Sequence, residues 1–206
     1  MAHAATMNEI ERYENQLTPG WGKLMMWVFL CSDAMSFAGL LATYGAVRLG
    51  SSNWPNPATI LDVPLTAVNT FILICSSVTM VKALSAIRHG NRRGMLGWLL
   101  GTMLGGSMFL SIQAYEWTHL IATEHLTIQS NPFGVSTLFG ATFFILTGFH
   151  GCHVLSGVIY LFCVFVRGAQ GAYTAENNSS VEIVGLYWHF VDLIWILVFT
   201  FVYLIS

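Results

Sequence analysis

Charged residues are scarce in this chain of 206 residues. They make up 9% of the sequence, whereas a soluble domain carries about 25%. Hydrophobic residues make up 55%, and the mean hydropathy is +0.63. A soluble domain of this length leaves roughly 30% of its unfolded surface exposed to water, which is too much for so apolar a chain. The composition therefore excludes a water-soluble enzyme and a disordered chain, and it indicates a membrane protein.

Net charge and cysteine are low as well. The formal net charge is -2, which gives no reason to expect a nucleic-acid partner. The four cysteines show neither the spacing of a metal motif nor that of a disulfide framework. We expect them to be small buried apolar residues; they are Cys31, Cys75, Cys152 and Cys163.

The hydrophobic runs are long and continuous, which predicts an all-α polytopic bundle and not a β-barrel. A membrane-spanning helix needs about 20 apolar residues. Five stretches qualify, at 22–47, 65–87, 95–117, 135–166 and 183–205. Residues 1–21 lack the apolar core of a signal peptide. We therefore expect an N-terminal cytoplasmic segment over 1–21 and one five-helix transmembrane domain over 22–206.

The basic residues predict the orientation of these helices. If the helices alternate in direction, seven of the eight basic residues fall on one side of the membrane, and only Arg48 falls on the other. The seven are Arg12, Lys23, Lys82, Arg88, Arg92, Arg93 and Arg167. The positive-inside rule then places the N-terminus in the cytoplasm and Ser206 outside.

Polar side chains inside the predicted spans are candidates for function, because burying them in a bilayer is costly. Three pairs lie three residues apart on one helix and so share a face. A further carboxylate, Asp33, lies near the middle of the first span. The pairs are Gln113 with Glu116, His150 with His153, and His189 with Asp192.

The pattern of these residues leaves several interpretations open. Histidine ligands suggest a metal or haem site, and Asp33, His189 and Asp192 suggest a proton or ion pathway. Lipid headgroup binding is another possibility. Interhelical hydrogen bonding, at about 0.6 kcal/mol for each bond, is the interpretation that the pattern alone favours.

Glycines recur at helical spacing on two spans. Such stripes allow close packing, either among the chain's own helices or against a neighbouring subunit. They comprise Gly97, Gly101 and Gly105 on the third span and Gly148, Gly151 and Gly157 on the fourth. No internal repeat is visible and no proline interrupts a span, which disfavours a standalone transporter.

Several motifs resemble subunit III of the haem-copper terminal oxidases. The stretch 147–154, Thr-Gly-Phe-His-Gly-Cys-His-Val, and the stretch 187–192, Tyr-Trp-His-Phe-Val-Asp, with Trp195 after it, are similar to two of the family's signatures. Four further segments match the family in the same order along the chain; they are 29–33, Asn69-Thr70, 76–79 and 113–117. In the first of them, the family usually has Glu in place of Asp33. The five-span count resembles the short bacterial form.

The resemblance implies a role in a respiratory complex of the bacterial cytoplasmic membrane. Subunit I carries haem and copper, reduces dioxygen and pumps protons, whereas subunit III binds no metal itself. Subunit III is expected to contact subunit I, subunit II and other subunits of the complex. It is expected to stabilise subunit I, to hold structural phospholipids, and to support proton uptake or oxygen access. His150, His153, His189 and Asp192 match motif positions, which implies interhelical hydrogen bonding and lipid contact.

One carboxylate of the family departs from its usual spacing. Family members carry a carbodiimide-reactive carboxylate shortly before the Asn-Thr pair. Asp62 lies in a similar segment, 61–65, but two residues further from Asn69. Asp33 is the better candidate for a buried carboxylate, and both residues are candidates for proton uptake.

Three other functions remain possible from the sequence. A subunit III-like component of a nitric-oxide reductase or of a supercomplex would carry the same motifs. A standalone proton or ion transporter would use Asp33, Glu116 and Asp192. A haem-binding membrane anchor would use His150 and His189.

Overall fold

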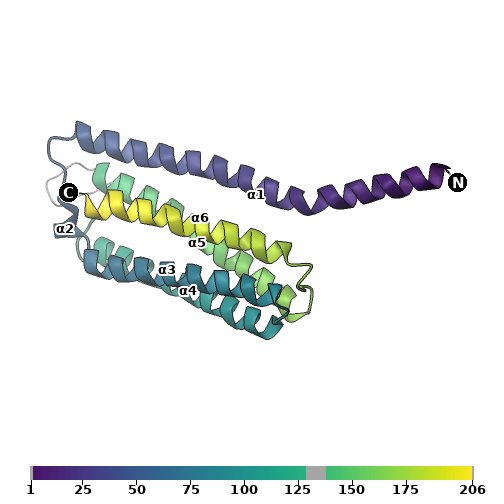
Figure 1. The fold of residues 1–206 in the computed structure, drawn as a ribbon. Helices are drawn as coiled ribbons and strands as arrows, with labels where there is room; N and C mark the ends of the chain where they lie inside the picture. The colour runs from purple at the N-terminus through teal and green to yellow at the C-terminus, as the bar shows by residue number, and fades with distance from the viewer. Residues whose placement is uncertain (1, 129–137, 206) are drawn as a thin grey trace.

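The fold is a bundle of long helices (Figure 1). The structure, a computed structural model, describes residues 2–128 and 138–205, without the side chains of 2–19, 57 and 58. Its elements are α1 (Ala2–Gly50), α2 (Pro57–Ile60), α3 (Val63–Arg88), α4 (Arg92–Ala122), α5 (Leu138–Ala169), α6 (Ser179–Phe199) and the π-helix η1 (Thr200–Leu204).

The predicted fold class is confirmed. The described residues contain helices and no strand, and five helices are long and apolar enough to span a membrane. The first of these spans is the part of α1 from Gly20 to Gly50. The predicted beginning of the fourth span, at residue 135, lies outside the described residues.

The helix ends follow from local sequence. The Asp62 carboxylate accepts a hydrogen bond from the Leu65 amide at 3.1 Å at the beginning of α3, and Asn91 accepts one from the Gly94 amide at 2.9 Å at the beginning of α4. Both are N-cap bonds, which satisfy an amide that has no partner within the helix. Gly90 has a φ of +73° between α3 and α4, a conformation that glycine adopts without strain.

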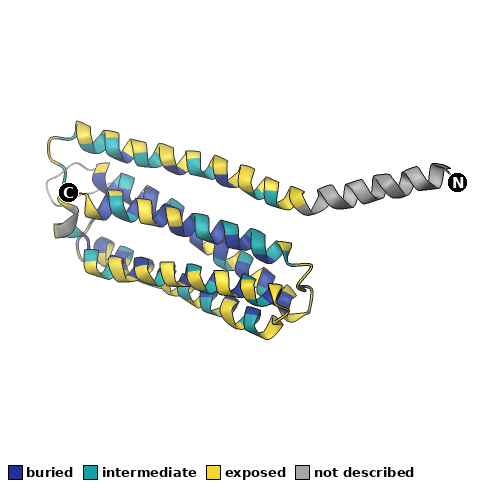
Figure 2. Ribbon diagram, viewed as in Figure 1, coloured by how far each residue is buried: buried dark blue, intermediate teal, exposed yellow. Residues whose placement is uncertain are grey.

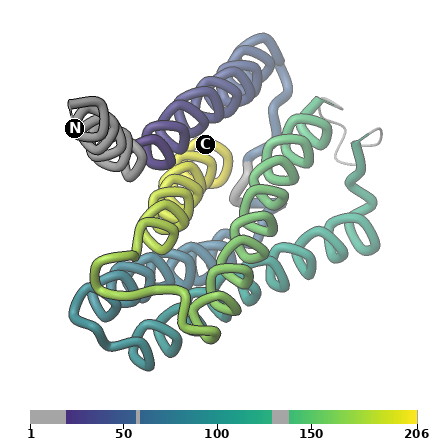
Figure 3. Tube along the Cα trace, turned by 90° about the vertical axis from the view of Figure 1, so that its right-hand side faces the viewer, coloured from purple at the N-terminus to yellow at the C-terminus, as the bar shows by residue number. Residues whose placement is uncertain are grey.

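Helix α6 is the centre of the bundle. It packs against α1, α3 and α5, and Figure 3 shows it between α1 and the α3–α4 pair. Two of its tryptophans are fully buried and donate hydrogen bonds to α3, Trp188 to Ser76 Oγ at 3.0 Å and Trp195 to Thr70 Oγ1 at 2.9 Å. These indoles fix the rotation of α6 about its own axis.

Helix α1 lies at the edge of the bundle, against α5 and α6 (Figures 1 and 3). Much of its surface is exposed, whereas α6 is largely buried (Figure 2). The exposed residues include large apolar side chains such as Trp27, Val28 and Met35. An apolar exterior of this kind fits a hydrocarbon solvent and not water.

The expectation that the cysteines are buried was wrong. All four are unpaired and exposed on the outside of the bundle. Hydropathy does not separate a residue that faces lipid from one that faces the protein core, because lipid tails are as apolar as the core.

Candidate functional site

The closest contact between ionisable groups in the middle of the bundle joins α1 to α5. Asp33 Oδ2 lies 2.9 Å from His153 Nε2. The two side chains are only 13% and 14% exposed. The contact ties the peripheral helix α1 to the body of the bundle.

The hydrogen bond of His153 to the backbone of α5 indicates which of its ring nitrogens carries a hydrogen. Its Nδ1 lies 2.7 Å from the carbonyl oxygen of Phe149, which only accepts, so Nδ1 carries a hydrogen. The Nε2 of a neutral ring then presents a lone pair toward the Asp33 oxygen. The contact thus brings two ionisable groups together within the membrane-spanning region.

His150 turns to a different neighbour. It is fully buried, and its Nε2 lies 3.1 Å from the carbonyl oxygen of Val191 on α6. Its ring centroid is 4.8 Å from that of Trp195 and 5.7 Å from that of Phe109. His150 thus links α5 to α6, whereas His153, on the same face, links α5 to α1.

The two polar residues His189 and Asp192 of α6 also have different surroundings. Asp192 is buried and accepts a hydrogen bond from Ser77 Oγ of α3 at 2.7 Å. His189 is half-buried and lines an apolar groove of about 330 Å³ between α1 and α6. The predicted pathway residues Asp33, His189 and Asp192 therefore face different neighbours.

Glu116 and Gln113 lie in a second polar cluster, at the end of the bundle that carries the C-terminus. Gln113 Nε2 donates to Glu116 Oε2 at 3.3 Å. Tyr203 of η1 donates to the same oxygen at 3.1 Å, and the Thr66 hydroxyl of α3 lies within hydrogen-bond distance of Oε1, at 3.1 Å. Asp62, the N-cap of α3, is exposed and lines a pocket beside Glu116.

Only some glycines of the two predicted stripes lie close to a neighbouring helix. A Cβ on Gly105 would lie 2.7 Å from Ser76, one on Gly148 3.0 Å from Trp117, and one on Gly157 3.1 Å from Trp188. Gly101 leaves ordinary contact distance to Thr79, and Gly97 and Gly151 have no described atom within 4 Å of that position. The tightest approach is at Gly106, where a Cβ would lie 2.4 Å from Trp188.

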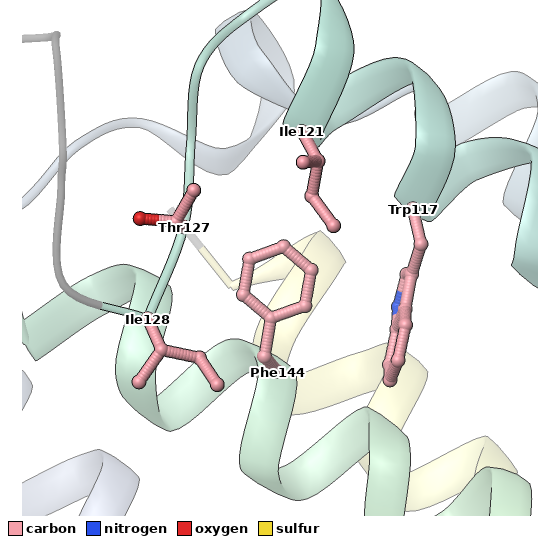
Figure 4. Close-up of a pocket in the computed structure, with 5 residues that line it drawn as sticks. All are labelled: Trp117, Ile121, Thr127, Ile128 and Phe144. Carbon is pink, nitrogen blue, oxygen red and sulfur yellow. The ribbon is translucent and has the colours of Figure 1, made fainter.

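Apolar grooves follow α4 and α5 on the outside of the bundle. One of about 460 Å³ is lined by Trp117, Ile121 and Phe144 and, on one side, by Thr127 and Ile128 of the following loop (Figure 4). A second, of about 340 Å³, is lined by Trp117 as well as by Gly148, Gly151 and Cys152. Because both share Trp117, they lie next to each other along one helix pair.

Comparison with known proteins supports the resemblance that the sequence motifs indicate. The sequence model of the family described as "Cytochrome c oxidase subunit III" matches residues 11–206. The chain belongs to the cytochrome c oxidase subunit III family. It is therefore part of an oxidoreductase complex and a multi-pass membrane protein.

Individual members of the subunit III family carry two kinds of name. The "Cytochrome c oxidase subunit 3" of Corynebacterium diphtheriae is 41% identical over 183 residues, 87% of this chain and 85% of that one. The protein of the same name from Thermostichus vulcanus is 35% identical over 190 residues, 91% of this chain and 89% of that one. The "Probable quinol oxidase subunit 3" of Staphylococcus saprophyticus is 33% identical over 208 residues, 100% of this chain and 98% of that one.

Sequence reasoning did not find every residue that organises this subunit III fold. Tyr203 and Thr66 bind Glu116, yet they are uncharged and do not stand out in an apolar run. Their signal is chemical: a tyrosine buried in a bilayer needs an acceptor for its O–H. Within the described residues, no group of three or more His, Cys, Asp and Glu side chains is arranged to hold a metal ion.

Proposed function

We propose that the chain is the non-catalytic subunit III of a respiratory haem-copper oxidase in the bacterial cytoplasmic membrane. In this proposal it binds subunit I, which carries the haem and copper of the complex, together with subunit II and further subunits. It stabilises subunit I during turnover, binds structural phospholipids, and supports proton uptake or oxygen access. Its own residues bind no redox centre.

The observation that carries the proposal is the Asp33–His153 contact. A carboxylate oxygen of Asp33 and the imidazole Nε2 of His153 lie 2.9 Å apart in the middle of an apolar bundle. Such a pair can take up one proton from its surroundings and release it again without any metal, because both the carboxylate and the imidazole accept protons. Its place between α1 and α5 supports a role in both proton uptake and the attachment of α1.

The apolar grooves support the lipid part of the proposal. The grooves along α4 and α5 and between α1 and α6 are lined almost entirely by apolar side chains. Grooves of this lining suit acyl chains, which need shape complementarity and no hydrogen bonds.

The charge at the two ends of the bundle supports the proposed orientation. At one end, Glu182 lies 2.8 Å from Lys23 and 3.3 Å from Arg88. At the same end, the Arg92 guanidinium donates to the carbonyls of Gly168 and Ala169. At the other end, Arg48 donates to the carbonyl of Ile205 at 2.7 Å. The basic end is the proposed cytoplasmic end.

Purification of the tagged chain in a mild detergent tests the proposal. We expect a haem- and copper-containing catalytic subunit to co-purify in stoichiometric amount, with oxygen consumption by the eluate. After the chain is separated from that subunit, it should show no haem absorbance. The proposal would be wrong if the chain purified without a haem protein, or if the separated chain kept the haem.

An oxidase complex prepared without this subunit tests the stabilising role. We expect oxidase that lacks this chain to begin turnover at its normal rate and then to lose activity after fewer turnovers than the complete complex. An equal lifetime with and without the chain would contradict this role.

A further inference from the structure

The carboxyl group of Glu116 is buried among donors, and no lysine or arginine in the described part of the chain pairs with it. The side chains of Glu116, Gln113, Thr66 and Tyr203 belong to residues that are 6%, 5%, 2% and 2% exposed. None of the described residues that line the adjoining pocket or donate to Glu116 is a lysine or an arginine. An ionised carboxylate here would be an uncompensated charge in the bilayer, which is the costly state.

The hydrogen bonds around Thr66 fit a neutral acid. Thr66 Oγ1 lies 3.1 Å from Glu116 Oε1 and 3.0 Å from the carbonyl oxygen of Asp62. The hydroxyl has one hydrogen, whereas the Asp62 carbonyl only accepts. An ionised carboxylate would have to share the single Thr66 hydrogen with the Asp62 carbonyl as a three-centre bond. A hydrogen on Glu116 Oε1, donated to Thr66, would make each contact a full hydrogen bond.

The second oxygen completes the same arrangement. Glu116 Oε2 accepts from the Tyr203 hydroxyl at 3.1 Å and from the Gln113 amide at 3.3 Å, as the carbonyl oxygen of an acid does. Tyr203 lies on η1, the π-helical turn at the end of α6. Such turns occur frequently at functional sites. The turn directs the Tyr203 hydroxyl toward α4.

A pocket of about 110 Å³ connects this acid to the end of the bundle. It is lined by Glu116, Asp62, Tyr115 and His119, together with three apolar residues. One water needs about 10–15 Å³ of such space and a few polar partners, so the pocket is large and polar enough for water. Asp62 and His119 are exposed at its rim.

From these contacts, we propose that Glu116 is a second proton-binding site of this chain, at the C-terminal end of the bundle and separate from the Asp33–His153 pair. Its carboxyl group is a neutral acid that exchanges its proton with the solution through the pocket lined by Asp62 and His119. In the exchange, the O–H bond on Oε1 breaks, the proton passes to water in the pocket, and a proton from water forms the new O–H bond. The titratable groups that face it are Asp62, Tyr115, His119 and Tyr203.

Infrared difference spectroscopy of the intact complex tests this proposal. In the spectrum of the wild type minus that of Glu116→Gln at neutral pH, we expect the C=O stretching band of a protonated carboxylic acid. In D2O the band should shift to lower frequency. If this difference spectrum showed carboxylate stretching bands and no acid band, Glu116 would be ionised and the neutral state would be overturned. An acid band that does not shift in D2O would overturn the proton exchange.

Two further variants sharpen the test. Glu182→Gln removes a carboxylate that is paired with Lys23 and Arg88, so its difference spectrum should show carboxylate bands and calibrates the measurement. Tyr203→Phe keeps Glu116 and removes one donor to its carbonyl oxygen, so the acid band should move to higher frequency. This variant also serves if Glu116→Gln does not assemble, and an unchanged band in Tyr203→Phe would contradict the proposal.

Discussion

The Trp188 ring of α6 lies directly against the backbone of Gly106 in α4. A Cβ at position 106 would lie 2.4 Å from the ring and 2.9 Å from Val158, and a Cβ on Gly157 of α5 would lie 3.1 Å from the same ring. Trp188 also donates to Ser76 of α3. One side chain therefore joins four helices, and glycine at position 106 makes the approach possible.

Gly106→Ala should destabilise the subunit. A methyl group there forces the indole or the helix to move, and overpacking of this kind costs about 1–3 kcal/mol. We expect a lower midpoint of thermal unfolding for this chain in the purified complex. Gly101→Ala is the matched control on the same helix, because its Cβ would lie 3.7 Å from Thr79, an ordinary contact. Equal midpoints for the two variants would contradict the role assigned to Trp188.

Ser77→Ala should also destabilise the bundle, by removing the donor to Asp192. Asp192 Oδ2 would be left buried without that hydrogen bond, at a cost of about 1–3 kcal/mol. The measurement is again the unfolding midpoint. Ser111→Ala is the control, because its hydroxyl is exposed and donates only to Ser107 on its own helix. We expect that control to stay within about 0.5 kcal/mol of the wild type.

The sequence predicts the helices well because length and hydropathy determine whether a segment can span a bilayer. The third predicted span, 95–117, falls inside α4 (Arg92–Ala122), and the second, 65–87, falls inside α3 (Val63–Arg88). The errors of the sequence prediction concern which face of a helix points toward the protein core. Cys152 was expected to be buried and is exposed, because the same apolar residue suits both lipid and core.

The candidate site is predicted in part. Spacing correctly places His150 and His153 on one helix, but spacing on one helix does not identify the partner helix. The structure directs His153 to Asp33 and His150 to the Val191 carbonyl. Tyr203 is the clearest omission, because its contact with Glu116 depends on the π-helical turn η1, which no periodicity in the sequence indicates.

The orientation of the chain remains a prediction, and reporter fusions test it. Alkaline phosphatase, which folds only outside the cytoplasm, should be active when fused after Ser206 and inactive when fused in the α5–α6 loop near Ala175. The reason is that Lys23, Arg88, Arg92 and other basic residues gather at the end that contains this loop. The reverse pattern of activity would show that the bundle is inverted.

Replacement of Asp33 tests whether the contact with His153 serves proton uptake. Asp33→Ala removes the carboxylate that lies 2.9 Å from His153 Nε2, and with it one of the two ionisable groups of the contact. We expect the initial oxidase rate to stay near that of the wild type, while the number of turnovers before inactivation falls or proton uptake slows. Stopped-flow proton uptake and the total oxygen consumed before inactivation measure these effects.

Two variants separate the proton role of Asp33 from simple packing. Asp33→Glu keeps a carboxyl group at the position where the family usually has Glu, and should restore proton uptake. Asp33→Asn keeps the size of the side chain but not its acidity, so it should behave like Asp33→Ala if the carboxyl group matters as an acid. If Asp33→Asn behaved like the wild type, Asp33 would serve only to hold α1 against α5. If Asp33→Ala prevented haem incorporation into the partner subunit, the contact would act in assembly and not in proton uptake.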